Sequence, residues 1–132
     1  MSALDASVLV AHLRPADAHH SAATELLRDA LDEDLVAHAI TIAEVLVGGV
    51  RINPGEEMLT DLRAIGVEVA PLADDEPLRL AHLRAATGVR MPGCCVLATA
   101  LNTNASLATF DKALAAAARE REVGIHPTSR RS

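Results

Sequence analysis

The chain has 132 residues, of which half are hydrophobic and only one is aromatic, and its formal net charge is −6. This length suits a single domain, residues 1–132, with an aliphatic core. An acidic chain argues against nucleic-acid binding unless its acids surround a metal ion. The adjacent Cys94 and Cys95 are poorly placed for a mutual disulfide, and no apolar run reaches the roughly 20 residues of a membrane span. We therefore expect a cytoplasmic protein without membrane contact.

Short apolar runs alternate with longer amphipathic segments, which is typical of an α/β protein with a parallel sheet. Met1–Leu4 is a predicted strand, and a helix begins near Val8. His19–Leu31 has apolar side chains at helical spacing and is predicted to be a second helix. Leu35–Ala39 is the second predicted strand.

In the middle of the chain, Thr41 precedes Glu44 by three residues, the spacing of a capping box at a helix start. After a loop at Pro54-Gly55, the pattern predicts a helix over Glu56–Ile65 that Gly66 ends. The third predicted strand is Val67–Pro71.

Acids and a proline at 74–77 predict the start of a helix that ends before Gly88, with the acids on the surface. Pro92 and Gly93 precede a further helix, Cys94–Asn102. The remaining predicted elements are a strand at Ser106–Thr109, a helix at Lys112–Glu122, an edge strand at Val123–His126 and a disordered tail at 128–132.

Three acids stand where a predicted strand gives way to a loop or helix, namely Asp5, Glu44 and Asp111. Ligands of parallel α/β sheets bind at the carboxyl ends of the strands. Carboxylates gathered there repel one another unless a cation lies between them, and Mg²⁺ and Mn²⁺ prefer oxygen ligands. The pattern predicts a metal pocket lined by these three carboxylates.

Each acid also has an ordinary structural interpretation. Glu44 alone is explained by the capping box, Asp5 alone by a turn, and Asp111 alone by a helix N-cap. The His19-His20 pair is interpreted as a solvated helix start, and the other histidines are given no role. Cys94 and Cys95 are expected to pack at a helix start, with a thiol nucleophile as a weaker alternative.

Four segments together resemble the sequence blocks of PIN-domain ribonucleases of the VapC toxin class, and they cover nearly the whole chain in the expected order. The segments are LDASVLV at 4–10, TIAEVLVG at 41–48, RMPGCCVLATAL at 90–101 and LATFDKAL at 107–114. The resemblance implies a PIN-like three-layer α/β/α fold around a central parallel sheet of four or five strands.

In the family that the chain resembles, each block supplies one acid to a pocket that holds Mg²⁺ or Mn²⁺ for RNA cleavage. Asp5, Glu44 and Asp111 match three of these acids, and they are the catalytic and metal-binding residues that the resemblance implies. Gly93 occupies the place of the fourth, so we expect weaker metal binding and reduced ribonuclease activity. The hydroxyls of Ser7 and Thr109 are expected to hold the carboxylates.

The resemblance also implies a cognate VapB-type antitoxin, an RNA substrate and a homodimer. A catalytically silent module that binds antitoxin is the alternative function, and Gly93 favours it. A phosphorylated receiver domain ranks far behind, because Asp5 stands alone and Lys112 adjoins Asp111. The candidate phosphate contacts are Arg14, Arg51, Arg84, Arg90 and Lys112.

Overall fold

Five parallel strands form one sheet in the order β3-β2-β1-β4-β5 in the computed structural model, which describes residues 1–30, 32–51 and 55–126. This arrangement confirms the predicted α/β fold with a central parallel sheet. The strands are β1 (Ser2–Leu4), β2 (Leu35–Ala37), β3 (Val67–Val69), β4 (Ser106–Ala108) and β5 (Ile125–His126).

Seven helices are present in the described residues, and they connect the strands. They are α1 (Ala6–Leu13), α2 (His20–Asp29), α3 (Ala39–Arg51), α4 (Gly55–Ala64), α5 (Glu76–Thr87), α6 (Met91–Thr103) and α7 (Lys112–Glu120). None of the described helices is long and apolar enough to cross a membrane. The predicted tail, 128–132, and Pro54 of the predicted loop lie outside the described residues.

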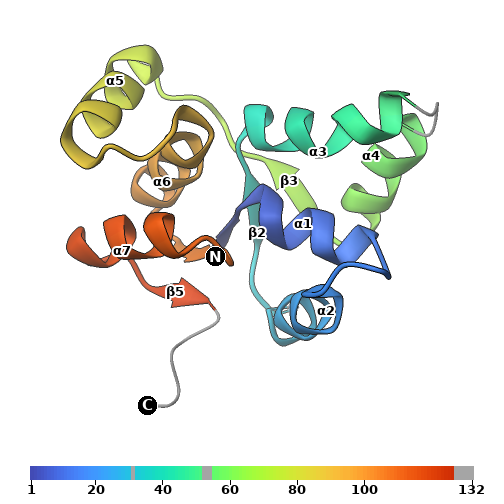
Figure 1. Cartoon of the computed structure of the whole chain (residues 1–132). Helices are drawn as coiled ribbons and strands as arrows, with labels where there is room; N and C mark the ends of the chain where they lie inside the picture. The colour runs from blue at the N-terminus through green and yellow to red at the C-terminus, as the bar shows by residue number, and fades with distance from the viewer. Residues whose placement is uncertain (31, 52–54, 127–132) are drawn as a thin grey trace, which may run out of the picture.

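The helices cover the two faces of the sheet in two groups, because successive strand residues point to opposite faces. Leu4 of β1 and Ala108 of β4 pack with apolar side chains of α1 to α4. Their strand neighbours Ala3 and Leu107 pack instead with α6 and α7, and Leu83 of α5 joins this second cluster. Figure 1 shows the resulting three layers, with α1 to α4 on one side of the sheet and α5 to α7 on the other.

The start of α3 differs from the predicted capping box. The helix begins at Ala39, and its first turn is capped by His38, whose ring Nδ1 accepts the Ile40 N–H at 3.1 Å. Thr41 therefore lies inside the helix, where its hydroxyl is buried without a hydrogen-bond partner among the described residues. The capping interpretation of Glu44 is wrong because an imidazole one turn earlier supplies the cap.

Helix α6 begins at Met91, three residues earlier than predicted, so Gly93 lies in its first turn. Helix α1 begins earlier as well, at Ala6, because the Asp5 carboxylate caps it. The glycines predicted to end helices do adopt the left-handed conformation that glycine tolerates, with φ of +93° at Gly66 and +72° at Gly88.

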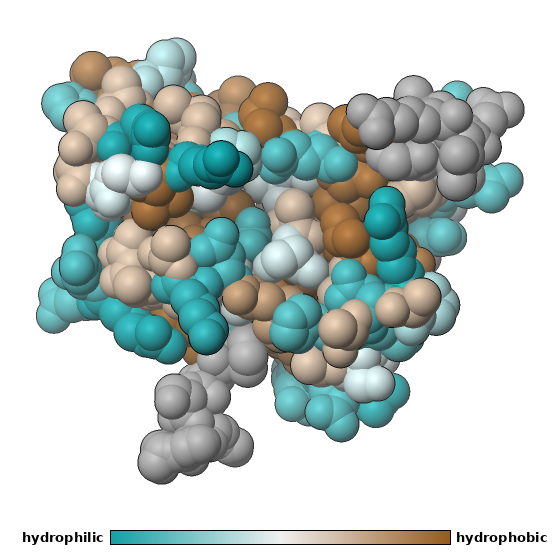
Figure 2. Space-filling model, in the orientation of Figure 1, coloured by the Kyte–Doolittle hydropathy of each residue, from teal (hydrophilic) through white to brown (hydrophobic). Residues whose placement is uncertain are grey.

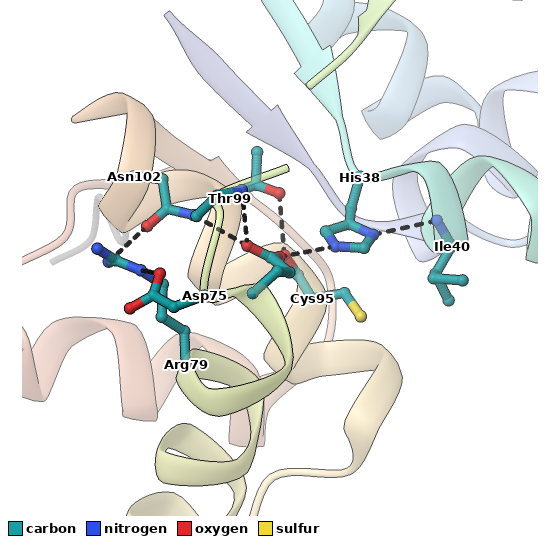
Figure 3. A network of polar contacts seen from close by, with 9 residues as sticks. His38, Ile40, Asp75, Arg79, Cys95, Thr99 and Asn102 are labelled. Atoms are coloured by element: carbon teal, nitrogen blue, oxygen red, sulfur yellow. Dashed lines mark hydrogen bonds and ion pairs between the residues drawn. The ribbon is translucent and has the colours of Figure 1, made fainter. Parts of the chain in front are cut away.

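A buried polar network joins β2, α5 and α6, and the sequence did not reveal it (Figure 3). Glu76, predicted at the surface, is only 5% exposed, and its Oε2 accepts the Nε2–H of His38 at 2.9 Å. Its Oε1 accepts longer bonds from the Ala73 N–H at 3.3 Å and the Asn102 side-chain amide at 3.4 Å. Because Nδ1 of His38 accepts the Ile40 N–H, the proton of this ring lies on Nε2.

Candidate active site

Adjacent strands β1 and β4 deliver Asp5 and Asp111 to the same edge of the sheet, because the strands pair in parallel. The Thr109 hydroxyl connects the two acids. It donates to Asp5 Oδ2 at 2.6 Å and accepts the backbone N–H of Asp111 at 2.9 Å. The two predicted metal ligands therefore share one buried hydroxyl between them.

Ser7 completes this network from the first turn of α1. Its hydroxyl donates to Asp5 Oδ2 at 2.7 Å and accepts the backbone N–H of Phe110 at 3.1 Å. Both hydroxyls thus donate to the Asp5 carboxylate, while their role beside a metal ion stays a prediction. The contacts fix the orientation of an acidic side chain that would otherwise rotate at a strand end.

Both aspartates also cap helices, so their ordinary structural interpretations hold as well. Asp5 Oδ1 accepts the Ala6 N–H at 2.9 Å, and Asp111 Oδ1 accepts the Leu114 N–H at 3.1 Å. These bonds use one oxygen of each carboxylate. Asp111 is exposed, and its second oxygen makes no hydrogen bond with any described residue. Capping and ligand binding are compatible at these positions.

Glu44 lies on the exposed side of α3 and forms no hydrogen bond or ion pair with the rest of the described chain. Its negative charge nevertheless reaches α6, where it contributes to the raised pKa of Cys95. No three His, Cys, Asp or Glu side chains in the described ranges form a group able to hold a metal ion. The structure thus brings Asp5 and Asp111 together and leaves Glu44 outside such a group, and the shared role of the three acids stays a prediction.

Position 93 is crowded by Val89 rather than open. A Cβ atom built on Gly93 would lie 2.6 Å from Val89 Cγ1 and 3.7 Å from Leu114 Cδ1. Any side chain here would require Val89 to move. The sequence interpretation that only a ligand is missing is therefore incomplete, because a neighbouring methyl group occupies the start of the space that an aspartate would need.

The two cysteines are buried, as expected for packing residues. Burial is the largest cause that raises the pKa of Cys95, and together with the charges of Cys94, Glu76 and Glu44 it brings this pKa to about 11. Burial also raises the pKa of Cys94, whose thiol donates to the Val89 carbonyl at 3.2 Å. Both groups are protonated thiols near neutral pH, which argues against the nucleophile alternative.

The donor set suits a hard divalent cation. Asp5, Asp111 and the neighbouring hydroxyls present only oxygen atoms, the ligands that Mg²⁺ and Mn²⁺ prefer. Mg²⁺ usually keeps several waters and is held through one or two carboxylates, so a pair of fixed aspartates fits this ion without a closed cage of protein ligands.

An aromatic stack beside Asp111 was missed by the sequence interpretation of His19. This histidine is exposed at the start of α2, but its ring stacks on Phe110 with centroids 4.6 Å apart and planes 14° from parallel. Phe110 is the one phenylalanine of a chain without tyrosine or tryptophan, and it immediately precedes an acid. The position of Phe110 next to a predicted site residue was the sequence signal that could have drawn attention to this region.

The family profile of the PIN domain matches residues 3–120, which includes both strand-end aspartates and both hydroxyls. The chain belongs to the PIN domain family. PIN domains are typically nucleases, and these nucleases generally use a divalent metal, in keeping with the oxygen donors at the ends of β1 and β4. None of the curated proteins matches the chain.

In this PIN domain, Thr109→Val is expected to lower any metal-dependent cleavage by about 10- to 100-fold, the usual effect of losing a partner that orients a ligand. Valine keeps the shape of threonine but cannot donate to Asp5 or accept the Asp111 N–H. Cleavage rates at several Mn²⁺ concentrations would test this. Thr103→Val removes a hydroxyl that only bonds within α6, and it serves as the control.

Proposed function

We propose that this PIN domain is a metal-dependent endoribonuclease toxin of the VapC class, with activity impaired by Gly93. The observation that carries the proposal is the Asp5–Thr109–Asp111 network, in which one hydroxyl bonds the Asp5 carboxylate and the backbone N–H of Asp111 at the edge of the sheet where α/β proteins bind ligands. The four sequence blocks support the finer assignment to a toxin–antitoxin system, with a VapB-type antitoxin as partner and a homodimer as the assembly.

Asp5 and Asp111 would hold a Mg²⁺ or Mn²⁺ ion. The ion supplies positive charge that activates water and stabilises a phosphate under attack. Ser7 and Thr109 keep the Asp5 carboxylate oriented toward that position. Glu44, exposed and near α6, is assigned either to the metal or to the attacking water, from which its carboxylate would accept a proton.

The test is cleavage of a long single-stranded RNA with Mn²⁺, with Mg²⁺ and with EDTA. We expect slow cleavage that requires the metal and that is lost in Asp5→Asn and in Asp111→Asn. Both substitutions keep side-chain size and remove charge, while Asp61→Asn makes the same change at an exposed acid of α4 and serves as the control. Cleavage that persists in EDTA, or in both variants, would overturn the proposal.

A catalytically silent module that sequesters antitoxin is the second candidate, and the packing at position 93 favours it. Gly93 supplies no ligand, and Val89 fills the space beside it. Under this alternative the protein captures the VapB-type product of the neighbouring gene with no RNA cleavage above that of Asp5→Asn. Capture together with metal-dependent cleavage excludes it.

A further inference from the structure

A groove of about 430 Å³ opens beside the aspartate pair and runs along α7 toward the edge strand β5. Asp111 lies at its wall near the strand ends, and Ile125 of β5 lines its other side. Figure 2 shows hydrophilic side chains over much of α7 on this face. The groove is therefore continuous with the candidate active site, because Thr109 and Asp111 belong to its lining, and it extends beyond the two acids along α7.

Two cations line this groove in an otherwise acidic chain, namely Lys112 and Arg119. They are seven positions apart on α7, which places them on one face of the helix about 10 Å apart along its axis. Both are exposed, and neither forms an ion pair with another residue that the structure describes. Their charges are thus available to a ligand that carries negative groups at intervals.

The aromatic stack adds a second element to the same region. Phe110 lines the groove and also stacks on the exposed ring of His19. The stack connects the start of α2 with the loop between β4 and α7, immediately before Asp111. Flat rings beside a basic track are the two features with which proteins bind unpaired nucleotides, through stacking of bases and neutralisation of phosphates.

The geometry points to the α7 groove as the binding track for a single-stranded RNA segment next to the phosphate that is cut. This inference rests on the proposed nuclease function for its substrate class. Lys112 and Arg119 contact backbone phosphates, and an unpaired base stacks on the His19–Phe110 pair. An acidic peptide would satisfy the two cations but has no use for the aromatic stack, so RNA fits the groove better.

Equilibrium binding of a short fluorescein-labelled single-stranded RNA, measured by anisotropy in EDTA over a range of salt concentrations, tests the track without cleavage. Lys112→Ala with Arg119→Ala is expected to weaken binding at least about tenfold and to flatten the plot of log K against log salt by about 1.4. His19→Ala is expected to weaken binding about five- to a hundredfold with an unchanged slope. The matched control is Arg63→Ala, which changes an exposed arginine on α4 at the opposite edge of the sheet.

The inference would be overturned if the Lys112→Ala, Arg119→Ala double variant bound the RNA as tightly as Arg63→Ala does. It would also be overturned if a hexaglutamate peptide displaced the RNA and His19→Ala bound the RNA with unchanged affinity. The second result would assign the groove to an acidic peptide. Cleavage assays with Mn²⁺ on the same proteins separate the two proposals. If the protein cleaves RNA with the metal but the substitutions leave RNA binding unchanged, only the inference about the groove is wrong. If the substitutions weaken RNA binding but no cleavage occurs, only the proposed nuclease function is wrong.

Discussion

Gly93→Asp combined with Val89→Ala is expected to raise Mn²⁺-dependent RNA cleavage by more than about a hundredfold over the unchanged chain. Loss of a residue that merely orients a metal ligand costs about 10- to 100-fold, and a direct ligand should count for more. The added carboxylate would lie in the first turn of α6, where the helix dipole favours negative charge. Cleavage rates and Mn²⁺ affinity by calorimetry are the measurements.

Removal of the Val89 methyl groups is part of the design because a Cβ at position 93 would lie 2.6 Å from Val89 Cγ1. Gly93→Asp alone should therefore gain less activity than the double variant. Gly93→Asn in the same Val89→Ala background has nearly the same shape without the charge, and it should gain little. Equal rates for the Asp and Asn forms would show that position 93 does not contribute a metal ligand.

Most of the fold follows from patterns that the sequence displays directly. Strand positions were predictable because the apolar runs are short, and because Gly66 ends a helix directly before β3. Helix starts were predicted less well, because the α3 cap is an imidazole rather than the hydroxyl of Thr41. A cap that comes from a residue outside the usual capping types leaves no local signal.

The aspartate pair of the candidate site was predictable for a physical reason. Asp5 directly follows β1 and two residues separate Asp111 from the end of β4, and parallel neighbours place such residues at one edge. Glu44 was harder, since it lies on a helix whose position relative to the sheet depends on packing. The crowding of Gly93 by Val89 and the His19–Phe110 stack depend on contacts between separate segments, which no local pattern encodes.

His38→Leu is expected to reduce the free energy of unfolding by about 3 kcal/mol, the lower end of the usual loss when one partner of a buried pair is removed. The Glu76 carboxylate would stay buried, with only the 3.3 Å bond from Ala73 and the 3.4 Å bond from Asn102. The variant also loses the cap on α3. Urea unfolding followed by circular dichroism gives the free energies.

The double variant His38→Leu with Glu76→Leu distinguishes a lost partner from lost packing. Burying two apolar side chains leaves no unpaired charge, so the double variant should be more stable than His38→Leu alone. Such a result gives the two positions a coupling energy in a double-mutant cycle. If the losses in free energy of unfolding of the single variants His38→Leu and Glu76→Leu add up to that of the double variant, the 2.9 Å contact contributes nothing to stability. His38 also caps the helix that carries Glu44, so both variants remove this anchor at the start of α3 as well.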